Sequence, residues 1–210
     1  EAFRLTSYLQ FSPAVYFTSS RLILTFDIVG PKKVEITPRK YQKNFSDYVG
    51  IGKNGNLWVE DCDVEDLVKK YGSPLLIISE SQFRQSFREF KKAFTDSYEG
   101  EVEVLYANKS NNSLALRHIM NQEGGGGDCF GVNEMYISLL AGTDPKTLVL
   151  NGSNKQDEEL EMAISNGLCI NIDSMDELGR ISEISKKLNK SVDIGIRLAL
   201  DLDPLADKTG

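Results

Sequence analysis

The sequence is poor in the side chains that build most metal and nucleophilic sites. Its 210 residues include one histidine, His118, and three cysteines, Cys62, Cys129 and Cys169. A single histidine excludes a two-histidine metal site and disfavours a nucleophile–histidine triad. The cysteines have neither metal-binding nor disulfide spacing, so we interpret them as buried or free thiols of a reducing compartment. We therefore expect no metal, and we expect the protein to be cytoplasmic.

Long apolar runs and an excess of positive charge are also missing. The most apolar segment, residues 21–30, contains Asp27 and is shorter than the roughly 20 residues that a membrane helix needs. The net charge is −7, which disfavours binding to nucleic acid or to an anionic membrane. The chain starts at Glu1 without a signal-peptide pattern, so we expect a processed or trimmed piece.

From about residue 72 onward, short apolar runs alternate with segments of helical periodicity. The runs are continuous rather than alternating, which is typical of strands buried on both faces of a parallel sheet. A doubly wound sheet and a (β/α)8 barrel both fit this alternation, and the number of units does not decide between them. The expected strands are 74–79, 102–107, 128–131, 147–150, 168–172 and 192–198, and the expected helices include 113–122, 133–141, 157–165 and 175–188.

The first 60 residues have a different pattern. We expect strands at residues 21–29, 34–37 and 56–59, followed by a short helix from Asp63 to Tyr71. Asp63 is a favourable N-cap, and Gly72 follows the last helical residue. We expect a β-rich N-terminal segment, residues 1–60, and a β/α part, residues 61–210.

Polar side chains stand where the expected parallel strands end. They are Lys109, Asp128, Asn151, Asp173 and Arg197. The carboxyl ends of parallel strands share one edge, where active sites of such folds lie. Structural alternatives remain for some of them: a turn at Asn151, a helix cap at Asp173, and an ion pair with Asp201 for Arg197.

Lys109 is the strongest candidate because it follows an apolar strand and precedes a helix start. In a cleft at this edge of the sheet, burial lowers the pKa of a lysine and frees its amine as a nucleophile. Such an amine forms a Schiff base with a carbonyl, either of a substrate or of pyridoxal phosphate. The run Gly124 to Gly127 lacks the Gly-Lys-Ser/Thr of a phosphate loop, so we expect a flexible connection there.

Several motifs then match one family, in the family's order. The sequence "YANKSN" resembles the Tyr/Phe-Ala-x-Lys-x-Asn signature of the fold-type III pyridoxal-phosphate enzymes, which include diaminopimelate, ornithine and arginine decarboxylases. Further segments that are similar to this family are "YGSPLLIIS", "GGDCFGVNEM", "LVLNGSNKQDEELEMAISNG", "NIDSMDELGRI" and "IGIRLALDLD". The opening "LWVEDCDVEDLVKKYGSP" most resembles the diaminopimelate branch.

The resemblance implies an α/β fold: a (β/α)8 TIM-type barrel like that of alanine racemase, incomplete in this chain. The N-terminal β-rich segment would belong to a second β-domain. Lys109 would be the catalytic residue and would bind pyridoxal 5'-phosphate as a Schiff base. Ala107, Asp128, Glu134 and Arg197 would lie near the cofactor. Gly131 stands where the family usually has a serine.

The implied activity is decarboxylation of an amino acid, in the first place of meso-diaminopimelate to L-lysine in lysine biosynthesis. The alternatives are a decarboxylase of ornithine, arginine or a related amino acid, an amino-acid racemase, a non-catalytic regulatory homologue, or a Schiff-base aldolase without pyridoxal phosphate. The family implies a homodimer with active sites at its interface. Residues for the cofactor phosphate and ring nitrogen lie beyond Gly210 in the family, so we expect the chain as given to be inactive.

Overall fold

The computed structural model describes residues 14–17, 22–26, 43–44 and 46–198, which divide into two compact units. Of the described residues, the first unit holds 43–44 and 46–90, and the second holds 14–17, 22–26 and 91–198. The expected division at residue 60 stays a prediction for the complete protein.

The first unit contains a small antiparallel sheet. Its strands, in spatial order, are β3 (Lys43–Asn44), β4 (Val49–Ile51), β5 (Leu57–Val59) and β6 (Cys62–Asp63). Helix α1 (Val64–Tyr71) begins directly after Asp63, whose Oδ1 accepts a hydrogen bond from the Glu65 N–H at 2.9 Å. Gly72 ends it with a φ of 86°, a conformation that favours glycine. The expected short helix and both of its caps are confirmed.

The strand expected at residues 74–79 is wrong. These residues belong to no strand, and Leu76 in their middle is 84% exposed. A strand needs a free partner edge, and both edges of the next strand along the chain, β7 (Val102–Ala107), are already paired. One edge binds β2 (Leu22–Phe26) and the other binds β8 (Gly126–Cys129). Helix α2 (Glu80–Thr95) follows, with the Gln82 N–H bonded to Ser79 Oγ at 3.1 Å.

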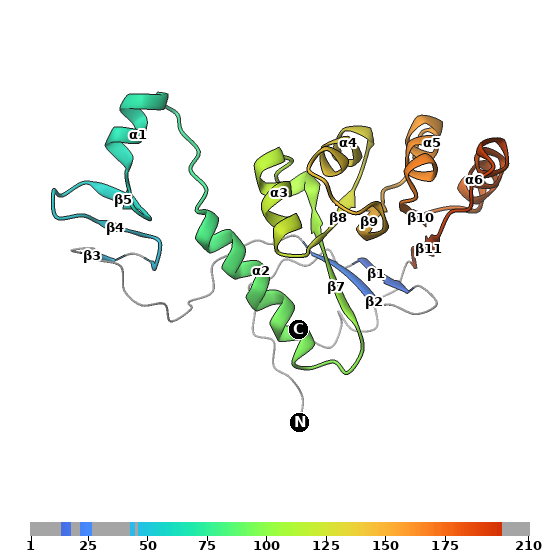
Figure 1. Ribbon diagram of the computed structural model, residues 1–210, viewed down its shortest axis with the longest axis horizontal. Coiled ribbons are helices and arrows are strands. Elements are labelled where there is room, and N and C mark those ends of the chain that lie inside the picture. The colour runs from blue at the N-terminus through green and yellow to red at the C-terminus, as the bar shows by residue number, and fades with distance from the viewer. Residues whose placement is uncertain (1–13, 18–21, 27–42, 45, 199–210) are drawn as a thin grey trace, which may run out of the picture. The chain divides into compact units, whose positions relative to one another are not determined.

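The second unit is built on a parallel sheet whose strands lie in chain order (Figure 1). After β7 and β8 come β9 (Leu148–Leu150), β10 (Cys169–Ile172) and β11 (Ile194–Ile196), each parallel to its predecessor. A doubly wound sheet would reverse this order at a switch point, and here it never reverses. The topology is therefore that of a (β/α) barrel, of which this unit forms five consecutive strands.

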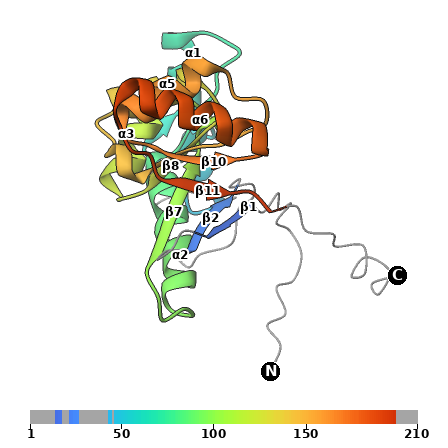
Figure 2. The ribbon, with the colours of Figure 1, turned by 90° about the vertical axis from the view of Figure 1, so that its right-hand side faces the viewer.

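Two further strands extend this sheet. β2 is parallel to β7, and β1 (Ala14–Phe17) is antiparallel to β2. The sheet curls so that β1 contacts β11 (Figure 2). β2 lies inside the expected strand 21–29, whereas the strand expected at 34–37 lies outside the described residues.

The helices of this unit follow the strands and cover one face of the sheet (Figures 1 and 2). They are α3 (Leu114–Gln122), α4 (Val132–Leu140), α5 (Asp157–Asn166) and α6 (Met175–Leu188), with the 3-10 turns η1 (Asn108–Ser110) and η2 (Pro145–Thr147). These four predicted helices are confirmed to within one residue at every end. Among the described residues, no helix has the length and apolar character to cross a membrane.

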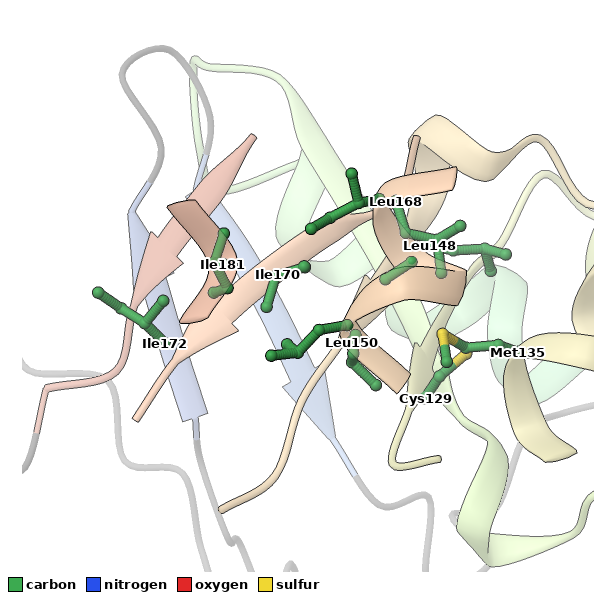
Figure 3. Packing of buried hydrophobic residues seen from close by; sticks show 11 residues of the cluster. Cys129, Met135, Leu148, Leu150, Leu168, Ile170, Ile172 and Ile181 are labelled. Carbon is green, nitrogen blue, oxygen red and sulfur yellow. The ribbon is translucent and has the colours of Figure 1, made fainter. Parts of the chain in front are cut away.

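The main core lies between the helices and the sheet (Figure 3). Leu148, Leu150 and Ile170 point from neighbouring strands toward Leu160 and Ile164 of α5, and all five are fully buried. The opposite face of the sheet carries Leu105, Val149 and Cys169. Because both faces are covered, the strands are continuous apolar runs, as the sequence indicated.

The expectation of a flexible connection at Gly124–Gly127 is wrong for its second half. Gly126 and Gly127 form the start of β8 and are buried. A Cβ on Gly126 would lie 2.2 Å from Leu105 Cδ2 and 2.3 Å from the Thr147 carbonyl oxygen, so a side chain there would overlap its neighbours. Buried Arg117 of α3 donates to the carbonyls of Gly125 and Gly126 at 2.5 and 2.7 Å. Packing against backbone, rather than flexibility, explains these glycines.

We predict that Gly126→Ala destabilises the fold by about 1–3 kcal/mol, because the added methyl group overpacks the sheet. Gly179→Ala is a matched control, since Gly179 lies in α6 with no atom within 4 Å of a Cβ and alanine favours a helix by up to about 1 kcal/mol. Urea unfolding of both variants measures the difference. Equal stability of the Gly126→Ala variant and the parent protein would contradict the packing argument.

Candidate functional site

The turn that follows β7 is fixed on both sides of Lys109. Asn108 is buried, and its side-chain amide donates to Ser138 Oγ at 2.8 Å and to Cys129 Sγ at 3.2 Å. Ser110 Oγ donates to the Ala107 carbonyl at 2.7 Å. These bonds hold the backbone of η1 rigidly, so Lys109 leaves the sheet edge from a fixed base.

Lys109 itself is exposed, and not in the buried cleft that the sequence predicted. Its ammonium lies 4.5 Å from the centroid of the Phe130 ring. This distance is within the range of a cation–π interaction. The structure therefore places a lysine amine at the carboxyl end of β7 where small molecules in solution can reach it.

Phe130 and Glu134 follow the end of β8 beside this lysine. Glu134 Oε2 accepts a hydrogen bond from the Phe130 N–H at 2.9 Å. Burial raises the pKa of Glu134, while the Phe130 N–H and the positive charge of Lys109 act in the opposite direction. Lys109, Phe130 and Glu134 thus form one group at the edge of the sheet where the strands have their carboxyl ends, which we call the rim.

Asp128 belongs to a second group, a chain of buried polar side chains on the inner face of the sheet. Asn151 donates to Asp128 Oδ1 at 2.8 Å, and Asn171 donates to Asn151 Oδ1 at 3.2 Å. All three residues are at most 3% exposed. Ala107 is the register partner of Asp128 in the neighbouring strand. The Asn151 amide thus orients the Asp128 carboxylate, and the Asn171 amide orients Asn151 in turn.

Arg197 lies just after β11 and pairs with Asp173, with 3.6 Å between Nη1 and Oδ1. Its backbone N–H also donates to the Ile172 carbonyl at 3.0 Å. The alternative partner Asp201 lies outside the described residues. Arg197 therefore marks the rim at the far end of the strand series, on the other side of β10 from Asn151.

A buried ion pair fixes the loop after β9. Lys155 Nζ lies 2.8 Å from Glu177 Oε2 and donates to the Gly152 carbonyl at 2.7 Å. The same Glu177 oxygen accepts the Asp173 N–H at 2.9 Å. Lys155 and Glu177 are 2% and 3% exposed. The pair connects the loops that follow two neighbouring strands.

The residues that were not singled out from the sequence include Phe130, Lys155 and Asn171, and Glu177 was expected only as part of a helix capping box. Asn171 carries a signal, because an amide interrupts the apolar run "CINI" of a buried strand. Lys155 and Glu177 lie in segments that carry the family resemblance, but nothing in their spacing predicts a contact. In the part of the chain that the structure describes, no cluster of three acidic, histidine or cysteine side chains could hold a metal ion.

Comparison with known proteins identifies the family. The family model described as "Pyridoxal-dependent decarboxylase, pyridoxal binding domain" matches residues 80–208. The chain belongs to this family. The match covers every strand from β7 to β11 and all the rim residues described above.

The curated relatives and solved structures that match include diaminopimelate decarboxylases. The one from Archaeoglobus fulgidus is 38% identical over 72% of this chain and 35% of its own length, and the one from Methanothermobacter thermautotrophicus is 34% identical over 75% and 35%. A crystal structure of the enzyme from M. jannaschii in complex with L-lysine is 32% identical, with a TM-score of 0.68 over 71% of this chain and 35% of that chain. The chain spans about a third of these relatives.

The side chains of the rim fit pyridoxal phosphate, the cofactor of this family. The cofactor offers a carbonyl carbon, polar ring groups and a phosphate. The rim offers an accessible amine on Lys109, an oriented carboxylate on Asp128 and a guanidinium on Arg197, which are the groups that bind such functions.

We predict that Lys155→Met destabilises the fold by about 3–5 kcal/mol, because it leaves the Glu177 carboxylate buried without its cation. The double variant Lys155→Met/Glu177→Leu should regain much of this loss. Lys92→Met is the matched control, since Lys92 forms an exposed pair with Asp96 and its loss should change stability by less than about 1 kcal/mol. Equal losses for the two single variants in urea unfolding would contradict the burial argument.

We also predict that Cys129 resists alkylation in the folded protein. Burial raises the pKa of its thiol to about 12, so at pH values near 9 the reactive thiolate is almost absent. Exposed Cys62 should react with iodoacetamide under the same conditions, and Cys129 should react only after unfolding. Peptide mass spectrometry measures both sites, and modification of Cys129 in the folded protein would refute the prediction.

Proposed function

We propose that the complete protein is a pyridoxal-phosphate-dependent decarboxylase that converts meso-diaminopimelate to L-lysine. The observation that carries this proposal is the accessible amine of Lys109 at the carboxyl end of β7, in a chain of the pyridoxal-dependent decarboxylase family. The names of the curated relatives support the substrate. The solved structures in complex with L-lysine, the expected product, support it further.

We assign the residue roles as follows. Lys109 binds the cofactor covalently through Nζ and, when released, holds or moves a proton at the same atom. Ala107 and Asp128 line the cofactor site side by side, with Asp128 kept in one orientation by the Asn151 amide. Arg197, fixed by Asp173, supplies a positive charge at the rim. When bound, pyridoxal phosphate supplies an electron-accepting ring that stabilises the charge left on Cα after carbon dioxide departs.

The assembly and setting of the protein are further parts of this proposal. Residues 1–60 would contribute to a second, β-rich domain, and the antiparallel strands β3 to β5 support this assignment for residues 43–59. The family resemblance supports a cytoplasmic homodimer with active sites at the subunit interface. The negative net charge supports a protein without nucleic-acid or anionic-membrane partners.

We predict that Lys109→Ala in the complete protein abolishes the visible absorbance that pyridoxal phosphate acquires on bonding to a lysine. Lys146→Ala, which removes an exposed lysine from η2, should leave the spectrum unchanged. An unchanged spectrum of the Lys109 variant would refute the assigned role.

Release of carbon dioxide then tests the substrate. The complete protein should release it from meso-diaminopimelate faster than from L-ornithine or L-arginine. Preference for either of the latter would overturn the proposed substrate within the family. A bound cofactor without carbon dioxide release from any of them would indicate a racemase or a non-catalytic homologue.

A further inference from the structure

The contact between Lys109 and Phe130 brings together the ends of two neighbouring strands. Lys109 follows β7 and Phe130 follows β8, and the ammonium lies over the ring at 4.5 Å. A leucine or valine at position 130 would fill similar space but would offer no negative ring face to a cation. The aromatic ring therefore adds an electrostatic attraction that an aliphatic side chain lacks.

The position of the ring is set by its surroundings. The Phe130 backbone is held by the hydrogen bond from its N–H to Glu134. On the side of β9, the ring packs against Gly152, where a Cβ would lie 3.0 Å from the ring atom Cδ1. Gly152 has a φ of 102°, which strongly favours glycine, and its carbonyl is held by Lys155. The ring that follows β8 thus lies between residues that follow β7 and β9.

We propose that Phe130 is a positioning residue for Lys109, whose free ammonium it holds at the rim through the face of its ring. This inference rests on the proposed function, in which Lys109 alternates between a cofactor-bound and a released state. A released lysine on an exposed turn would otherwise sample many rotamers in water. The cation–π contact exists only while the amine is charged, so the ring retains the ammonium and lets the neutral amine go. The carboxylate of Glu134 also attracts the ammonium of Lys109.

The test measures the reactivity of the Lys109 amine and needs no catalysis. The complete protein, freed of cofactor with hydroxylamine, is treated with a trace of acetic anhydride, and acetylation of Lys109 is compared with that of Lys146 in the same sample. Phe130→Leu should raise the relative rate at Lys109 by about two- to fivefold, because it removes the ring that holds the ammonium. Phe130→Tyr and Phe130→Trp restore an aromatic face and should keep the rate near that of the parent protein.

A rate in Phe130→Leu equal to that of the parent, or an equal increase in Phe130→Tyr, would overturn the proposal. If Phe130→Leu fails to fold, the parent protein still provides a test by NMR. The Lys109 ε-methylene protons should be shifted upfield by the ring current of Phe130, and an unshifted resonance would refute the contact. Neither measurement depends on cofactor binding. A wrong assignment of Lys109 as the cofactor lysine can therefore be distinguished from a wrong assignment of Phe130 as its positioning residue.

Discussion

Parallel hydrogen bonding between neighbouring strands brings the carboxyl ends of β7 to β11 to one edge of the sheet. The pairing also decides which side chains face inward, because alternate residues of a strand point to opposite faces. Asp128 is on the inner face, together with Val149 and Cys169 in register. Leu150 and Ile170 consequently face α5 and build the apolar core. The positions of Ala107 and Asp128 follow directly from this register.

The rim combines a rigid backbone with one long, accessible side chain. Buried side chains hold the turns: Asn108 fixes the turn after β7, and Lys155 fixes the loop after β9. Lys109 alone extends outward from these turns with an amine at its end. Chemistry that requires a lysine to bond and to be released needs both properties, because the bonded geometry must be reproducible while the side chain must be able to move. The polar chain that ends at Asp128 adds a fixed carboxylate next to the strand that carries Lys109.

The sequence predicted local structure well because local rules dominate there. α6 has the predicted bounds since Ser174 caps its first turn, and β7 has them since polar residues flank a buried run. The errors come from interactions between distant residues. The segment 74–79 has the composition of a strand, but both edges of β7, the next strand along the chain, are paired with β2 and β8. Gly126 resembles a loop residue in sequence, yet it is required by atoms of Leu105 and Thr147. The exposure of Lys109 likewise depends on whether distant residues cover this edge of the sheet, and the sequence around Lys109 does not encode that.

The ion pair between Lys155 and Glu177 restricts how this rim can change over evolutionary time. Each residue alone would be a charge in the interior, so a lineage that replaces one must pass through a poorly folded intermediate or replace both nearly at once. The two positions are 22 residues apart and lie in different β/α units. Among homologues they should accordingly vary together or not at all. The two loops that the pair joins, which contain Gly152 and Asp173, should then keep their conformations together. Exposed positions around them can vary independently.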